Sequence, residues 1–224
     1  MSLSEDELFL LSLYRSSEIN GSLFFGRLAR ALKPGPIQHD LTKHFADEAQ
    51  HAWYWTDCID RLGSRPIKLA DAYQDRYLEA VGLPMNVMEV LAITLVFERR
   101  VINQYAKHLA VANLHPAIGG TIDKIMEDER WHVQWVRDAL VDLEARFGKD
   151  HIASTLQRYR QADQDVYAQA LVEYEGRLGF LSPAPTPTDR TDDSCQRHHR
   201  GRSPKGGRDP RCPGDKGQPR RGAH

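Results

Sequence analysis

Four segments of the chain carry apolar side chains at steps of three or four residues, the spacing that places residues on one face of an α-helix. In the first segment this stripe is Leu8, Leu11, Tyr14, Glu18, Ser22, Phe25, Leu28 and Leu32, and in the second it is Ile37, Leu41, Phe45, Glu48, His51, Trp55, Ile59 and Leu62. In the third it is Val87, Leu91, Thr94, Glu98, Val101, Tyr105, Leu109 and Ala112, and in the fourth it is Ile118, Ile122, Ile125, Glu129, His132, Val136, Leu140 and Leu143. No useful stretch alternates with the period of two that a strand needs. The pattern therefore predicts an all-α protein.

Prolines and glycines mark the ends of these helices, because neither residue continues a helix well. Turns are predicted at residues 33–36, 62–66, 82–84 and 113–116, and Gly148 ends the fourth segment. The partly apolar residues 151–178 predict a fifth helix, which would cover the end of a bundle or contact another subunit.

Each of the four stripes is interrupted by a glutamate near its middle. In a tight helical hairpin, residues equidistant from the turn lie at the same level. The midpoint of Glu18 and Glu48 is position 33, and that of Glu98 and Glu129 is 113.5, so both midpoints fall in predicted turns. Residues 63–84 are long enough to cross the molecule. The sequence thus predicts an antiparallel four-helix bundle with one long crossover and four glutamates at one level.

An internal repeat relates the first predicted hairpin to the second. A shift of 80 or 81 residues superimposes Glu18 on Glu98, Glu48 on Glu129, His51 on His132 and Asp47 on Asp128. Such a repeat predicts an approximate two-fold axis between the two halves. In the second and fourth helices the glutamate belongs to a Glu-x-x-His motif, whose two side chains are neighbours on a helix.

Buried carboxylates gathered at one level need a counter-charge, because each unpaired one is destabilised by several kcal/mol. Two divalent cations would neutralise four carboxylates. Carboxylate and imidazole ligands without thiolate favour iron or manganese over a structural zinc ion. The predicted metal ligands are Glu18, Glu48, His51, Glu98, Glu129 and His132.

This ligand set resembles that of the ferritin-like non-haem di-iron carboxylate proteins, and the resemblance covers about residues 4–147. It rests on Glu18, Glu48-Ala-Gln-His51, Glu98 and Glu129-Arg-Trp-His132. The resemblance implies a ferritin-like fold that holds two ions. It implies that Glu48 and Glu129 bridge the ions. It also implies that Glu18 and His51 bind one ion, and that Glu98 and His132 bind the other.

The same resemblance implies two further acids around the site. Asp47 and Asp128 each precede a ligand glutamate and would accept the histidine N–H across the bundle. The implied cofactor is a pair of iron ions, with manganese or a mixed manganese and iron pair as the alternative.

The resemblance implies an enzyme, a di-iron oxidoreductase of the oxidase, oxygenase or hydroxylase type that activates dioxygen. Its expected partners are dioxygen or peroxide, a small-molecule substrate and an external electron donor. Iron oxidation and storage of the bacterioferritin type is an alternative, although Ala49 stands where those proteins place a haem-ligating methionine. Rubrerythrin-like peroxide reduction is another, although Val101 replaces a further glutamate and no Cys-x-x-Cys pair is present.

Several other residues have both a structural and a functional interpretation. Thr94 lies one turn before Glu98 and is the candidate for passing protons to reduced oxygen, or else an ordinary threonine bonded to a backbone carbonyl. Gly21 either leaves space beside the metals or permits close helix packing. His44 and His108 are expected to be partly exposed or hydrogen-bonded histidines rather than ligands.

The composition changes near residue 181. Residues 181–224 contain seven prolines, six glycines and eight arginines, and carry ten Lys/Arg against five Asp/Glu. Residues 1–180 therefore hold 20 basic and 26 acidic residues. The sequence predicts a helical domain over 1–180 and a disordered basic tail over 181–224, because the tail has too little apolar surface to offset its chain entropy.

Charge and cysteine content bear on the expected partners. The acidic helical part argues against nucleic-acid binding there, since phosphate contacts need clustered Lys and Arg. Three scattered cysteines, an acidic first segment and the lack of a long apolar run predict a cytoplasmic protein without a membrane span. A homo-oligomer is compatible with the sequence.

Overall fold

The computed structural model describes residues 3–69, 73–174 and 176–178, and within them the protein is all helical, as predicted. The helices are α1 (Glu5–Ala31), α2 (Pro36–Arg61), α3 (Tyr73–Val81), α4 (Val87–Leu109), α5 (Pro116–Asp142), α6 (Glu144–Phe147) and α7 (Lys149–Glu173). The predicted tail, 181–224, lies outside the described residues. None of the described helices is long and apolar enough to cross a membrane.

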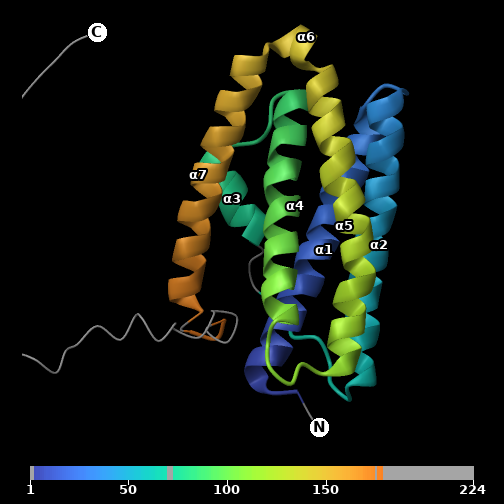
Figure 1. Cartoon of the computed structure of the whole chain (residues 1–224), viewed down its shortest axis with the longest axis vertical. Coiled ribbons are helices and arrows are strands. Elements are labelled where there is room, and N and C mark those ends of the chain that lie inside the picture. Colours follow the sequence, from blue (N-terminus) through green and yellow to red (C-terminus); the bar gives the residue numbers. More distant parts are fainter. Residues whose placement is uncertain (1–2, 70–72, 175, 179–224) are drawn as a thin grey trace, which may run out of the picture. The chain divides into compact units, whose positions relative to one another are not determined.

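The long helices α1 and α2 form one hairpin, and α4 and α5 form a second (Figure 1). Ser4 begins α1 with a capping box, in which its side chain accepts from the Glu7 N–H while Glu7 reaches back to the Ser4 backbone. Pro36 begins α2, where a missing N–H has no consequence. Between α4 and α5, Asn113 adopts a positive φ of 62°, which asparagine tolerates better than most residues.

The two hairpins meet mainly where α2 packs against α5. In Figure 1, α2 and α4 run downward while α1 and α5 run upward, so α4 follows the direction of α2 as the long crossover predicts. The connection itself contains α3, a helix that the sequence analysis did not anticipate. Tyr77 anchors α3 because its ring is fully buried and its hydroxyl donates to the Tyr159 carbonyl.

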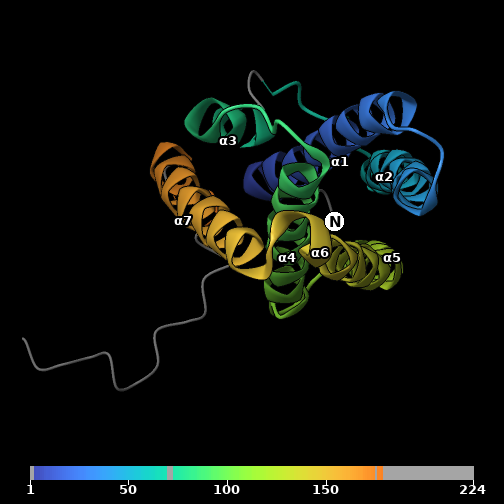
Figure 2. The same cartoon turned by 90° about the horizontal axis from the view of Figure 1, so that it is seen from above.

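Helix α7 lies against α4 and α3, as the view from above shows (Figure 2). An ion pair between Arg100 on α4 and Asp163 on α7 joins the two helices. The Tyr73 hydroxyl also donates to Asp163 Oδ1 at 2.7 Å, which ties the start of α3 to the same point. The Asp163 carboxylate raises the pKa of the Arg100 guanidinium despite its burial.

Two apolar clusters fill the interior around the hairpins. One includes Leu10, Leu11, Trp55, Ile59, Ile118 and Ile122. The other includes Phe25, Leu41, Leu91, Val136 and Leu140. The four glutamates of the stripes fall between these two sets along every long helix. A polar layer is therefore held between two apolar ones, which restricts its contact with water.

Candidate metal centre

All six predicted ligands are buried, with 0–5% of each residue exposed. They come from four helices: Glu18 from α1, Glu48 and His51 from α2, Glu98 from α4, and Glu129 and His132 from α5. The stripes thus placed every glutamate correctly toward the interior. Because buried carboxylates are rare unless they are compensated, the gathering of four of them indicates a site rather than a core.

The side chains form two groups that share one carboxylate. Glu18, Glu48, His51 and Glu129 each offer a ligand atom within 4.8 Å of the others. The second group combines Glu48 with His44, Glu98 and His132 at the same spacing. Both groups could hold a metal ion, and Glu48 is the residue common to the two.

Two aspartates hold the ring orientation of the histidines. Asp128 Oδ2 lies 3.2 Å from His51 Nε2, and Asp47 Oδ2 lies 3.2 Å from His132 Nε2. Each aspartate comes from the opposite helix of the α2 and α5 pair, as the resemblance implied. This contact directs the other nitrogen of each ring, Nδ1, toward the glutamates, with 3.3 Å between His51 Nδ1 and Glu129 Oε1.

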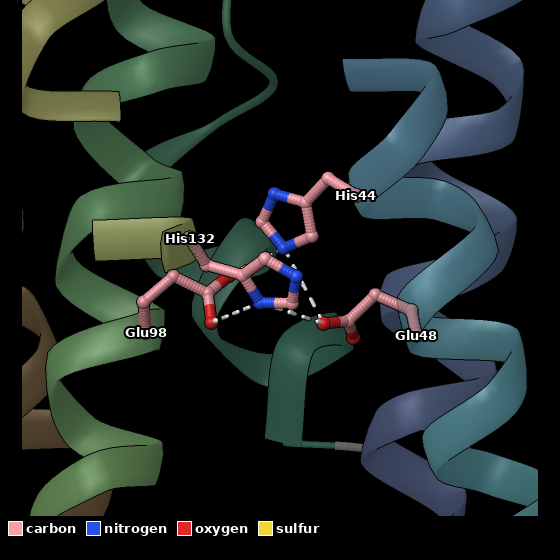
Figure 3. A group of neighbouring side chains, drawn as sticks. All are labelled: His44, Glu48, Glu98 and His132. Carbon is pink, nitrogen blue, oxygen red and sulfur yellow. Dashed lines mark ion pairs between the residues drawn. The ribbon is translucent and has the colours of Figure 1, made fainter. Parts of the chain in front are cut away.

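His44 joins the second group although the sequence analysis treated it as structural. It is fully buried, and its Nε2 lies 3.1 Å from Glu98 Oε1 and 3.3 Å from Glu48 Oε1 (Figure 3). Its ring stacks on that of His132 with 3.7 Å between centroids. Burial lowers the pKa of His44 to about 4, so its imidazole is uncharged near neutral pH.

The expectation for His44 failed because the stripe was traced through its neighbour. A step of four from Leu41 leads to Phe45, whereas a step of three leads to His44. Both steps are helical, and apolar periodicity favours Phe45 over His44. In the structure Phe45 is 36% exposed and His44 is fully buried, so the shorter step is the one that faces inward.

Crowding of the acids changes their pKa values. Burial, with the charges of Glu18 and Glu98, raises the pKa of Glu48 well above its usual range. Burial and the Glu98 charge raise the pKa of Glu129 to about 7. These carboxylates therefore lack sufficient positive charge from the protein alone.

The imidazoles supply part of that charge. Although burial opposes it, the carboxylates of Glu129 and Glu18 raise the pKa of His51 to about 12. Burial also opposes ionisation of Glu98, yet the hydrogen bond and the charge of His132 lower the pKa of that carboxyl. A bound cation would replace the protons on the histidines as the partner of the carboxylates.

A tyrosine that was predicted only as part of a stripe contacts the site directly. The Tyr105 hydroxyl donates to Glu18 Oε1, and Trp55 Nε1 donates to the Tyr105 oxygen at 3.0 Å. Burial and the Glu18 charge raise the pKa of Tyr105 well above its usual range, so the phenol stays protonated. The pair orients one oxygen of Glu18 and leaves the other free to face His51.

Glycine 21 lets the Glu48 carboxylate approach α1 closely. A Cβ at this position would lie 2.3 Å from Glu48 Oε2, a distance that no real Cβ contact permits. This contact supports close packing at Gly21, and the group that packs there is a candidate ligand. The same glycine also lines a cavity.

The cavity lies between α1, α3 and α4 and has a volume of about 250 Å³. Three of the four candidate ligand glutamates, Glu18, Glu48 and Glu98, line it, and much of the remaining wall is apolar. Thr94 is not among its lining residues and donates its hydroxyl to the Val90 carbonyl at 2.9 Å. A proton-transfer role for Thr94 stays a prediction.

The donor set fits a pair of divalent iron or manganese ions. It contains only carboxylate oxygens and imidazole nitrogens, which these metals accept. Several ligand atoms are buried without a hydrogen bond, among them Glu129 Oε1, His51 Nδ1 and both nitrogens of His44. Buried polar atoms of this kind are rare in proteins and call for a partner such as an ion.

Comparisons of the chain with protein-family models, with curated proteins and with solved structures give no match. The candidate centre therefore rests on the geometry of this chain alone.

Proposed function

We propose that the chain is a ferritin-like di-iron protein, built on a four-helix bundle of α1, α2, α4 and α5, and that it is an oxidoreductase acting with dioxygen on a small substrate. The observation that carries the proposal is the pair of buried ligand groups that share Glu48 and border a cavity. Two bound iron ions would supply the electrons that reduce dioxygen.

The candidate ligands have different surroundings on two sides of the centre. The histidines contact aspartates on one side, and three of the glutamates line the cavity on the other. Asp47 and Asp128 orient the histidines so that Nδ1 of each ring faces the glutamates, where the ions would bind. Glu18, Glu48 and Glu98 face the cavity, where dioxygen and a substrate would enter. The apolar part of the wall favours a small organic substrate over a hydrated iron ion.

Anaerobic titration with ferrous iron, followed by stopped-flow absorption after mixing with oxygen, tests this function. We expect two irons per chain, one rapid oxidation, and no further turnover until a reductant and a substrate are added. Glu48→Gln should lose the iron, whereas Glu127→Gln, an exposed change on α5, the helix that carries Glu129 and His132, should not. Oxidation of many irons per chain would instead support the storage function, and no iron binding would refute the centre.

A further inference from the structure

His44 occupies a position that neither packing nor hydrogen bonding explains. It is fully buried, yet neither of its ring nitrogens has a hydrogen-bond partner. Its Nε2 lies within 3.3 Å of oxygens from two different carboxylates, Glu48 and Glu98, without forming a hydrogen bond to either. A residue needed only for packing would avoid burying two unpaired polar atoms.

The surroundings of His44 fix the direction of its ring. One face stacks on His132, and Phe25 lies on the ring with 4.1 Å between centroids. Trp135 meets it edge-on at 5.8 Å. Held in this way, Nε2 points into the space between Glu48, Glu98 and His132, as Figure 3 shows.

The internal repeat shows that His44 belongs to one half only. The shift of 81 residues that superimposes Glu48 on Glu129 places His44 on Ile125, which is fully buried and cannot bind a metal. The shift of 80 residues that superimposes Glu18 on Glu98 likewise places Phe25 on Tyr105. The two halves are thus equivalent in their six predicted ligands and different in what surrounds them.

We propose that His44 is a seventh metal ligand, so that the two ion positions of the centre are chemically different. One position would have two imidazoles, from His44 and His132, and the carboxylates of Glu98 and Glu48. The other would have a single imidazole, from His51, with three carboxylates. This inference rests on the proposed metal centre.

The difference in ligands has a consequence for metal choice. Imidazole suits iron, whereas carboxylate-rich sites also suit manganese. The position next to His44 therefore favours iron, and the position next to His51 accepts either metal.

Equilibrium titration of the metal-free full-length protein with Co²⁺ under argon tests the role of His44 without using enzyme activity. The main variant is His44→Ile, which installs the residue that the repeat already carries at the equivalent position. His44→Gln is the second variant and preserves more polarity if the first folds poorly. His108→Gln is the matched control, because His108 is also fully buried, and its pKa is likewise lowered to about 4 by burial.

The wild type and the control should bind two Co²⁺ per chain. In both His44 variants we expect one binding step to weaken by roughly 10- to 100-fold or more, the loss seen when groups supporting a metal site are removed, while the other step is unchanged. X-ray absorption of the loaded proteins should show about 1.5 imidazoles per ion in the wild type, three histidines over two ions, and about one in His44→Ile.

Two results separate the possible failures. If the wild type binds two Co²⁺ and both His44 variants bind them with the same affinities and imidazole count, His44 is not a ligand, although the centre stands. If the wild type binds no Co²⁺, the proposed function and this inference fall together.

Discussion

Single residues decide how closely the helices approach the candidate centre, and Gly21 does so most directly. Gly21→Ala should displace the Glu48 carboxylate, because the new Cβ would lie 2.3 Å from Oε2. We expect metal affinity to fall roughly tenfold or more, measured by titration with Mn²⁺. Gly120→Ala is the control, since nothing lies within 4 Å of its Cβ. It should leave binding unchanged and stabilise α5 by up to about 1 kcal/mol. Equal binding by both variants would contradict the structural role given to Gly21.

A buried histidine far from the predicted ligands should make the protein sensitive to acid. Burial lowers the pKa of His108 to about 4, whereas an unfolded histidine has a pKa of about 6.5. Between these values the unfolded chain binds a proton that the folded chain does not. This group therefore reduces the free energy of unfolding by up to about 1.4 kcal/mol for each unit that the pH falls.

Urea denaturation of the chelator-treated protein between pH 7 and 4.5 measures this effect. His108→Gln should show a shallower loss of stability on acidification than the wild type, because all other titrating groups are common to both. If the free energies of unfolding of the two proteins fall in parallel as the pH is lowered, His108 takes up its proton in the folded state as readily as in the unfolded state.

Of the ion pairs that join α7 to α4, the one between Asp163 and Arg100 is more buried than the one between Arg158 and Glu89. Asp163→Ala would leave the Arg100 guanidinium, whose side chain is only 16% exposed, without its carboxylate. We expect a loss of about 3 kcal/mol, as for other largely buried pairs that lose one partner, measured from the urea midpoint. Asp165→Ala, an exposed change on the same helix, should alter stability by less than about 0.5 kcal/mol. If Asp163→Ala loses no more stability than Asp165→Ala, the Arg100–Asp163 ion pair is not what holds α7 against α4.

The sequence could not predict α3, because this helix is too short to show a periodic pattern. Its nine residues have a single fully buried side chain, Tyr77, which gives too short an apolar stripe for a periodic pattern. The long helices were predictable because each repeats its stripe over more than 20 residues. Tertiary packing against α7, rather than local periodicity, stabilises the shorter element.

For the molecule as a whole, metal binding and folding stability should be linked. Ions that bind only the folded chain add about 2.7 kcal/mol per site at a hundredfold excess over the dissociation constant. The melting temperature should therefore rise when Mn²⁺ replaces a chelator, which differential scanning calorimetry would show.

Glu48→Gln should remove most of this stabilisation by the metal. Burial and the neighbouring carboxylates raise the pKa of Glu48, so a neutral amide removes an unfavourable charge from the chelated protein. The variant should be at least as stable as the wild type in chelator and should gain little from Mn²⁺. A full increase in melting temperature on adding Mn²⁺ would show that the shared carboxylate is dispensable.

The sequence by itself determined the all-α class, the four long helices and the inward direction of the six predicted ligands, because helical periodicity is a local property that a long stripe reveals. The tertiary structure alone decided that His44 rather than Phe45 faces the centre, and that Tyr105 reaches Glu18. It also showed that a cavity opens on the carboxylate side. These features depend on the rotation of each helix relative to its partners, and a shift of one residue changes which side chain is buried. The distances that join residues from different helices are set by packing, which no single stripe contains.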